Sequence, residues 1–270
     1  MKTATKIVKS IFRKRNGHKG NFKKLPWIQE KILKHQEDQS IKKASFENFA
    51  VYYKRPYELL YTYKEIFEKE IYRFSPDTET PFIVDCGSNI GLSVLYYKQL
   101  SPGATIVAFE PDESNFQLLT KNVTENKLAN ITLRKEAVWK ENGKISFSAN
   151  ETEASHILQG ESGDNLVQAI RLKEFLETCH EIDLLKIDIE GAEWEVINDC
   201  AKSLGKVKNL FLEYHGKASE TQKLVDLLAV VKEAGFCVYL KMAADQMQHP
   251  FVEKTLDTPY DVQLNLFCYR

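Results

Sequence analysis

The stretch that most constrains the fold is residues 81–91, which read Pro-Phe-Ile-Val-Asp-Cys-Gly-Ser-Asn-Ile-Gly. The apolar run at 82–84 has the length of a buried strand, and Gly87 and Gly91 follow four positions apart. Residues 92–100 then show the apolar spacing of a helix. A strand, a glycine turn and a helix begin the nucleotide sites of open α/β sheets, because unpaired backbone N–H groups at the helix start face the ligand.

Downstream of this unit the sequence alternates between strand and helix patterns. We expect strands at 82–86, 105–110, 131–133, 144–148, 184–189, 210–214, 237–240 and 262–269, and helices at about 90–100, 113–126, 171–179, 192–204 and 223–234. This alternation predicts an α/β fold with a mostly parallel sheet and helices on both faces. The last strand is expected to run antiparallel, at or near the edge of the sheet.

Residues 1–80 differ from the rest of the chain, and we interpret them as a helical N-terminal extension before a domain at 81–270. Residues 1–43 contain thirteen Lys and Arg against three acidic residues, a net charge of +10, which leaves −11 for the remainder. Apolar spacing predicts two basic helices in this segment and an aromatic-rich helix at about 57–74. A basic start can contact phosphates, an anionic membrane surface or nucleic acid, or it can simply pack on the main domain.

The cysteines and the apolar runs bear on the cellular compartment. Five cysteines are scattered without CxxC spacing, which argues against a disulfide framework and a zinc ribbon. The first fifteen residues lack the apolar core of a signal peptide, and no apolar run approaches the roughly 20 residues of a membrane span. We therefore expect a cytoplasmic protein, with peripheral contact at the inner membrane face through residues 1–43 as an open alternative.

The glycine turn can be compared with known phosphate-binding loops. A dinucleotide turn requires G-x-G-x-x-G, but Asn89 occupies the position of the middle glycine. A P-loop requires Lys after its last glycine, and Leu92 follows Gly91. Asp85, two positions before the first glycine, suits a ligand that carries positive charge. The turn therefore favours neither a dinucleotide nor a triphosphate.

Acidic residues also stand at the carboxyl ends of two further predicted strands. Glu110, followed by Pro111, ends the strand next to the first one, where a carboxylate can accept hydrogen bonds from both ribose hydroxyls of an adenosine. Asp188 and Glu190 end the fourth strand, and strand alternation would place them on one side of it. Paired carboxylates of this kind can act as a general base or bind a divalent metal ion.

Three other polar residues are considered as possible contributors to a site near this edge of the sheet. His215 ends the next strand, in the sequence Glu213-Tyr-His215, where a general base would be useful. Glu193 is interpreted as a charge at a helix N-terminus, favoured by the helix dipole. His156, in a polar loop at 149–165, is a weaker candidate for substrate contact.

Four segments together resemble the FkbM family of S-adenosylmethionine-dependent methyltransferases: Asp85-Cys-Gly-Ser-Asn-Ile-Gly91, Phe109-Glu-Pro111, Leu185-Lys-Ile-Asp-Ile-Glu-Gly-Ala-Glu193 and Glu213-Tyr-His215. The resemblance covers about residues 80–240 and implies the class I methyltransferase sheet with S-adenosylmethionine as cofactor. It places the methionine end at the glycine turn, the ribose at Glu110 and the adenine beside residues 136–137. The implied cofactor-binding residues are Asp85, Gly87, Ser88, Asn89, Gly91, Glu110, Pro111, Glu136, Ala137 and Asp188.

The same resemblance implies O-methylation of a sugar, a glycan or another small molecule. A sulfonium methyl group is already activated, so the protein must align the acceptor and remove its proton. We expect His215 or Asp188 to take that proton, with Glu190 in the same catalytic group. Asp188, Glu190 and Glu213 are the residues that could bind a divalent metal ion.

Two other functions remain open from the sequence alone. A nicotinamide-dependent oxidoreductase would share the fold, and a cofactor-binding module could be recruited to membrane or nucleic acid by residues 1–43. A phosphorylated or lipid-linked acceptor would reconcile the basic start with the acidic domain. Nucleic acid is not expected as a substrate, because the domain is acidic and lacks an Asn-Pro-Pro-Tyr motif. Neither the acceptor nor the oligomeric state follows from the resemblance.

Overall fold

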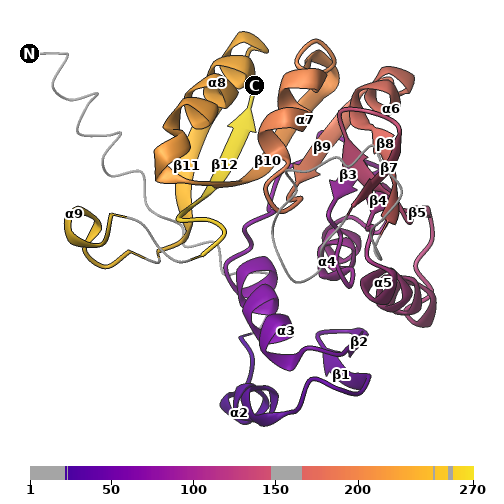
Figure 1. Cartoon of the computed structure of the whole chain (residues 1–270). Coiled ribbons are helices and arrows are strands. Elements are labelled where there is room, and N and C mark those ends of the chain that lie inside the picture. The colour runs from indigo at the N-terminus through magenta and orange to yellow at the C-terminus, as the bar shows by residue number, and fades with distance from the viewer. Residues whose placement is uncertain (1–21, 23, 147–165, 246, 255–257) are drawn as a thin grey trace, which may run out of the picture.

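The computed structural model describes residues 22, 24–146, 166–245, 247–254 and 258–270 (Figure 1). The basic helix expected within residues 1–21, and His156 with most of its polar loop, lie outside the described residues. No helix in the described part of the chain combines the length and the apolar character that a bilayer crossing requires.

A seven-stranded sheet forms the centre of the molecule, in the order β11-β12-β10-β9-β3-β4-β5. Its strands are β3 (Phe82–Cys86), β4 (Thr105–Phe109), β5 (Ile131–Arg134), β9 (Ile182–Ile187), β10 (Val207–Gly216), β11 (Cys237–Ala244) and β12 (Val262–Tyr269). Only β12 runs against its neighbours in this sheet, and it lies between β10 and the edge strand β11. The predicted class I methyltransferase sheet, with an antiparallel last strand near the edge, is therefore confirmed.

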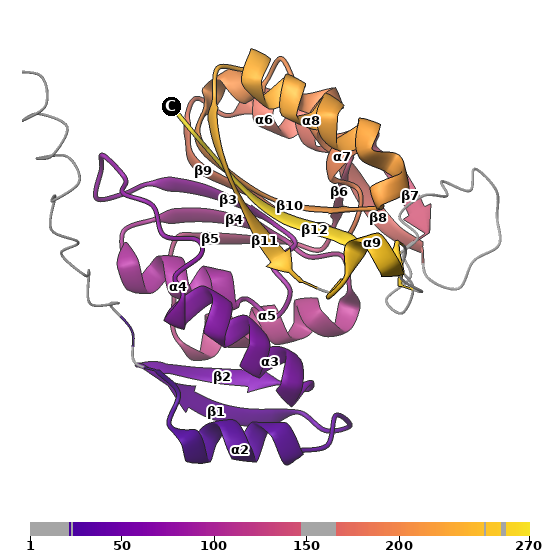
Figure 2. The ribbon, with the colours of Figure 1, turned by 90° about the vertical axis from the view of Figure 1, so that its left-hand side faces the viewer.

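Helices cover both faces of this sheet (Figure 2). The helices α4 (Leu92–Leu100) and α5 (Glu113–Glu125) lie on one face, and α6 (Leu172–Thr178), α7 (Glu193–Cys200) and α8 (Thr221–Glu233) lie on the other. Alternate residues of a strand enter opposite cores, so that Leu184 packs towards α4 and Leu185 towards α7. Burial on both faces explains why the predicted parallel strands read as continuous apolar runs.

A second, three-stranded sheet follows β5 and was only partly predicted. It consists of β6 (Ala137–Trp139), β8 (Leu166–Arg171) and β7 (Gly143–Ser146), in that order. The sequence predicted β7 as an added strand. It gave β6 no strand of its own, and it missed β8. The strand β8 pairs with β6 across about thirty residues of chain, and such long-range pairing leaves no local pattern.

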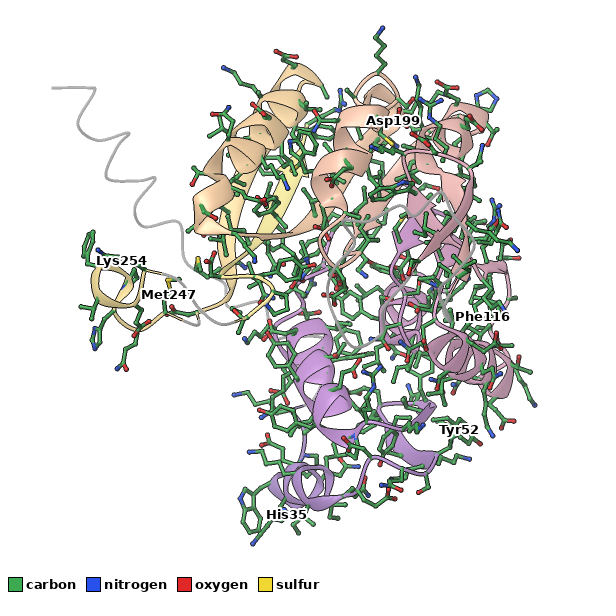
Figure 3. The ribbon with its side chains drawn as sticks, viewed as in Figure 1. His35, Tyr52, Phe116, Asp199, Met247 and Lys254 are labelled. Atoms are coloured by element: carbon green, nitrogen blue, oxygen red, sulfur yellow. The ribbon has the colours of Figure 1, made fainter. Side chains whose placement is uncertain are left out.

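The described part of the N-terminal extension contains two of the expected helices and a β-hairpin that the helical prediction missed. It comprises α2 (Trp27–His35), the hairpin strands β1 (Lys42–Phe46) and β2 (Phe49–Tyr53), and α3 (Pro56–Tyr63), which continues as a π-helix at Lys64–Glu68. Tyr52 lies on the hairpin (Figure 3). The side chain of Asn122 on α5 accepts a hydrogen bond from the Tyr52 N–H (2.7 Å) and donates one to its carbonyl (3.0 Å). Asn126 pairs with Ala50 in the same way. The partner of this strand is thus a helix some 70 residues away, which explains the missed hairpin.

Beyond β11 the chain forms one more short helix, α9 (Pro250–Glu253), before β12 begins. The helix α8 ends at Glu233, and Gly235 follows two positions later with a φ of +91°. A glycine in this left-handed conformation commonly follows the end of a helix.

Candidate functional site

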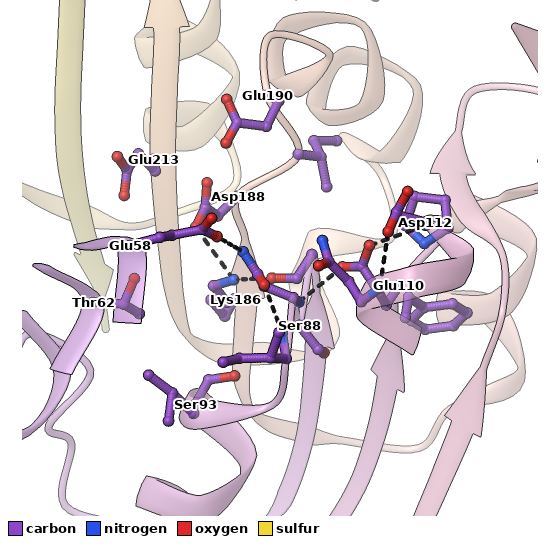
Figure 4. Close-up of a pocket in the computed structure, with 18 of the residues that line it drawn as sticks. Glu58, Thr62, Ser88, Ser93, Glu110, Asp112, Lys186, Asp188, Glu190 and Glu213 are labelled. Carbon is purple, nitrogen blue, oxygen red and sulfur yellow. Dashed lines mark hydrogen bonds and ion pairs between the residues drawn. The ribbon is translucent and has the colours of Figure 1, made fainter. Parts of the chain in front are cut away.

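A cavity of about 870 Å³ lies at the carboxyl ends of β3, β4, β9 and β10, where α3 of the extension forms its opposite wall (Figure 4). Its two ends differ in character. Glu110 and Asp112 lie at one end, and Asp188, Glu190 and Glu213 lie at the other. This arrangement brings the predicted ribose-binding residue and the predicted catalytic carboxylates into one space.

The glycine turn lines this cavity, but packing within the protein explains its glycines. Gly87 has φ +82°, and a Cβ there would lie 1.8 Å from the carbonyl oxygen of Asp188. Gly91 has φ +89°, and its Cβ would meet Leu119 at 2.6 Å. Gly87, Ser88 and Asn89 line the cavity, whereas Gly91 is not among the described lining residues. Close packing against the loop after β9 and against α5 therefore accounts for glycine at positions 87 and 91.

Asp85 departs from the expectation that its carboxylate faces the ligand. It is fully buried and lies outside the lining that the described residues provide. Its carboxylate accepts a hydrogen bond from Ser93 Oγ (2.5 Å) and lies 3.4 Å from Lys186 Nζ. The Asp85 side chain is therefore linked to the turn through the buried cation Lys186, rather than facing the cavity.

Lys186 is a site residue that the sequence interpretation missed. It is 2% exposed, lies 3.3 Å from Asp188 and donates a hydrogen bond to the Gly87 carbonyl (2.6 Å). Burial opposes its charge, but the carboxylates of Asp188 and Asp85 outweigh burial and raise the pKa of Lys186. A lysine flanked by the apolar residues Leu185 and Ile187 of a buried strand was the available signal, because a buried charge requires a partner.

Glu110 occupies the position that the sequence predicted for it. It is 5% exposed and accepts hydrogen bonds from the N–H groups of Asn89 (2.8 Å) and Asp112 (3.0 Å). Burial raises the pKa of Glu110 to about 7, although these two hydrogen bonds oppose the shift. Pro111, Glu136 and Ala137 line the same cavity, so the structure gathers these predicted cofactor contacts around Glu110.

Asp188 and Glu190 both line the cavity, although not for the predicted reason. The strand β9 ends at Ile187, so strand alternation does not relate the two residues. The chain turns through Glu190 (φ +58°) and Gly191 (φ +101°) before α7 begins. A turn in the loop, rather than a strand, therefore directs both carboxylates towards the cavity.

Glu193 begins α7, as the sequence predicted, and it is also fully buried. It accepts hydrogen bonds from the N–H groups of Ile189 and Gly191 (3.1 Å each), and its Oε1 lies 3.2 Å from His215 Nδ1. It therefore fixes the loop that carries Asp188 and also the ring of His215.

His215 has a strongly acidic environment. Its Nε2 lies 3.7 Å from Glu213 Oε1 and 3.8 Å from Glu190 Oε2. Burial would lower the pKa of His215, but Glu193, Asp188 and Glu190 outweigh burial and raise it to about 10. In this state the imidazole already carries the proton that a general base would have to accept.

Two carboxyl groups near His215, those of Glu213 and Glu190, also have raised pKa values. Burial, followed by the charge of Asp188, raises the pKa of Glu213 to about 8, and burial raises that of Glu190. Asp188, Glu213 and His215 each offer a ligand atom, and these atoms all lie within 4.8 Å of one another. Compared with the predicted metal-binding set, His215 replaces Glu190 in this compact group.

The extension contributes one wall of the cavity, which the sequence did not reveal. Glu58 on α3 accepts a hydrogen bond from Asn89 Nδ2 (2.6 Å), and the Tyr61 hydroxyl donates one to the Ala243 carbonyl (3.4 Å). Thr62, which follows Tyr61 on the same helix, lines the cavity. The helix α3 therefore contacts both the glycine turn and the edge strand β11.

Comparisons with known proteins agree with this geometry. A family model described as the methyltransferase FkbM domain matches residues 85–238. Methyltransferase 1 of Beauveria bassiana is 27% identical over 52% of this chain and 66% of its own length. The hexuronic acid methyltransferase AglP of Haloferax volcanii is 31% identical over 51% and 57%, and the 2-O-methyltransferase NoeI of Sinorhizobium fredii is 28% identical over 50% and 63%. The chain thus spans less than two thirds of the length of these relatives.

The family model covers the glycine turn, Glu110, the Asp188 loop and His215, which are the same residues that the fold brings around the cavity. It leaves the extension outside. The chain therefore belongs to the FkbM methyltransferase family.

Proposed function

We propose that this methyltransferase uses S-adenosylmethionine to methylate a hydroxyl group of a sugar, a glycan or another small molecule. The observation that carries the proposal is one cavity with Glu110 at one end and the Asp188–Glu190 pair at the other. Two similar proteins, named as a hexuronic acid methyltransferase and a 2-O-methyltransferase, support an oxygen acceptor.

The lining suits the cofactor. Each carboxylate oxygen of Glu110 accepts one backbone N–H, which leaves lone pairs for two ribose hydroxyls. The carboxylates of Asp188 and Glu190 complement the positive charge of a sulfonium. The cavity is near the upper end of the roughly 300–1,000 Å³ that small-molecule pockets occupy, so it has space for a nucleoside and an acceptor. When bound, S-adenosylmethionine would supply the activated methyl group.

The charge of the lining favours a neutral acceptor. Nine acidic side chains line the cavity against three basic ones, Lys54, Arg55 and Lys186. A phosphorylated acceptor, which residues 1–43 alone would suit, would bring its anionic group against these carboxylates. A hydroxyl-rich neutral glycan, by contrast, can donate hydrogen bonds to them. We therefore place neutral glycans first among the acceptors.

The proposal also includes roles for the catalytic residues, which the positions of their side chains support. Asp188 and Glu190 line the cavity, whereas His215 lies behind them and is not among the described lining residues. A hydroxyl group in the cavity therefore meets a carboxylate first. The proton passes from the acceptor hydroxyl to one of this pair, and His215 holds the carboxylates in place through the 3.8 Å approach to Glu190.

A methyl-transfer assay with labelled S-adenosylmethionine and a panel of neutral and anionic glycans tests this function. We expect calorimetric binding of the cofactor and transfer to neutral acceptors. At saturating cofactor, whichever of Asp188→Asn and Glu190→Gln removes the base should reduce turnover by about 10²–10⁴-fold. Absence of cofactor binding by the folded protein would reject the proposal. Liposome or RNA binding without methyl transfer would favour a recruited binding module instead.

A further inference from the structure

We propose that Asp188, Glu213 and His215 form a binding site for one divalent first-row transition-metal ion, with the side-chain carbonyl of Asn265 as a fourth ligand. The existence of this site does not depend on the proposed function. Only its role in binding the acceptor, described below, rests on that function.

The fold brings the three main ligands together from two neighbouring strands. Glu213 and His215 are two residues apart on β10, so their side chains leave the same face of the sheet. Asp188 follows directly after β9, which is the parallel neighbour of β10. The ligand atoms lie within 4.8 Å of one another, close to the separations of about 3–4.4 Å expected around an ion with bonds of about 2.0–2.2 Å. Small side-chain rotations therefore suffice to bind an ion.

The ring of His215 is held as metal-binding histidines usually are. Its Nδ1 faces the fully buried carboxylate of Glu193 at 3.2 Å, and a carboxylate on the second ring nitrogen orients a ligating histidine. Nε2 then points at the acidic cluster, and within the described part of the chain it has no hydrogen bond, its carboxylate neighbours being 3.7 and 3.8 Å away.

Asn265 is independent evidence for a ligand at this place. It lies on β12 directly opposite Glu213, and side chains of directly opposed residues share one face of a sheet. It is 5% exposed and lines the cavity, yet its Oδ1 is buried without a hydrogen-bond partner among the described residues. Such a carbonyl is costly to leave unpaired, and it needs a cation or a donor from a ligand. A metal ion bound by Glu213 would satisfy it.

The chemistry of the ligands and the local charge indicate the kind of ion. One imidazole with two carboxylates and a carbonyl suits Mn²⁺, Fe²⁺, Co²⁺ or Zn²⁺ better than Mg²⁺ or Ca²⁺, which prefer oxygen ligands alone. Two cationic side chains, Lys186 and His215, face a larger number of carboxyl groups here: Asp85, Asp188, Glu190, Glu193 and Glu213. This imbalance favours a further positive charge.

An ion at this position would contact the acceptor. Asp188, Glu213 and Asn265 line the cavity, so the remaining coordination positions face the bound substrate. Coordination of the acceptor oxygen lowers its pKa. The O–H bond would then break, and its proton would pass to the carboxylate of Glu190. The freed lone pair of the oxygen would attack the methyl carbon while the bond from that carbon to the sulfonium sulfur breaks, so that the sulfur leaves as a neutral thioether. This division of roles leaves Asp188 to the metal and Glu190 to the proton.

Titration of Mn²⁺ into the chelator-treated full chain, followed by the electron paramagnetic resonance signal of free Mn²⁺, tests the site. We expect one bound ion per chain. Glu213→Gln and Asp188→Asn should weaken its binding at least tenfold, and Glu193→Gln by about 10–100-fold. Glu136→Gln changes a carboxyl group in the same cavity but outside the cluster, and it should bind Mn²⁺ as the wild type does. Circular dichroism of each variant verifies that it is folded.

The proposal fails if the wild type binds no stoichiometric Mn²⁺, or if the Glu213 and Asp188 variants retain its affinity. Calorimetry with S-adenosylmethionine on the same metal-free protein separates this result from the proposed function. Cofactor binding and chelator-resistant methyl transfer without Mn²⁺ binding would overturn the metal site alone. Mn²⁺ binding without cofactor binding would overturn the methyl transfer alone. Mg²⁺ at the same concentration should displace little Mn²⁺.

Discussion

Glu58 Oε1 accepts a hydrogen bond of 2.6 Å from Asn89 Nδ2, which connects the N-terminal extension to the glycine turn of the methyltransferase domain. Asn89 has φ +49°, a left-handed conformation that few side chains other than asparagine adopt readily. Its amide is therefore held both by the turn and by a helix outside the family match. The extension thus helps to hold the glycine turn and also lines the cavity.

Glu58→Ala should weaken S-adenosylmethionine binding by about 1 kcal/mol, or about fivefold in Kd, because the Asn89 amide loses its acceptor. Isothermal calorimetry measures this directly. Arg55→Ala is the matched control, since Arg55 pairs with Glu58 (2.9 Å) and not with Asn89. Equal losses in both variants would show that the ion pair, rather than the contact with the turn, is responsible.

Cofactor affinity should rise with pH around neutrality because of Glu110. Burial raises the pKa of this carboxyl to about 7, so it gains its charge between about pH 6 and 8 and becomes the stronger acceptor for ribose hydroxyls. Calorimetry at pH 6 and 8 should show tighter binding at the higher pH. Glu110→Gln should bind more weakly at pH 8, and its affinity should depend less on pH.

The same carboxyl should have the opposite effect on the stability of the free protein. Its folded pKa lies above the ordinary value of 4.5, so its contribution to the free energy of unfolding falls as pH rises from about 4.5 to 7. Glu110→Gln should therefore stabilise the cofactor-free protein more at pH 8 than at pH 5. Urea denaturation at both values measures the difference, and an equal effect at both would contradict the assignment.

Lys186→Met should lower the free energy of unfolding by about 3–5 kcal/mol, because it leaves Asp85 buried without its cation. Urea denaturation provides the measurement. Adding Asp85→Asn should recover part of the loss, since the uncompensated charge then disappears. Lys208→Met is the control: this lysine pairs with Asp183 on a more exposed surface, and its loss should cost about 1 kcal/mol or less. Similar losses for both lysines would mean that burial of the pair does not matter.

Asn122→Ala should loosen the hairpin of the extension more than it loosens the sheet. The substitution leaves the N–H and carbonyl of Tyr52 without their partner, a cost of about 1–3 kcal/mol. Hydrogen exchange at the Tyr52 amide should accelerate, while exchange in β3 should change only with global stability. Gln117→Ala, which removes an exposed contact on the same helix, should leave the hairpin unaffected.

The central sheet could be predicted because its strands are buried on both faces. Apolar runs such as 82–84 and 184–185 reveal such strands locally, and the last strand was placed with its correct bounds at Val262–Tyr269. The hairpin could not be predicted in this way. Its outer edge pairs with Asn122 and Asn126, and a side chain acting as a strand partner leaves no period in the sequence of the hairpin itself.

The sequence predicted which carboxylates gather at one edge of the sheet, but not their environment. Glu110, Asp188 and Glu190 line one cavity, because strand ends of a parallel sheet share one edge. The burial of Glu193 and the charge of Lys186 depend on neighbours from other strands, and sequence spacing does not report these. The cavity wall that α3 contributes lies outside the family match.

The contact between Gly87 and the Asp188 carbonyl has a consequence for how this protein can change during evolution. Any side chain at position 87 would place its Cβ 1.8 Å from that oxygen, so it would push aside the loop that bears Asp188 and Glu190. A substitution at position 87 would therefore change the glycine turn and this loop together.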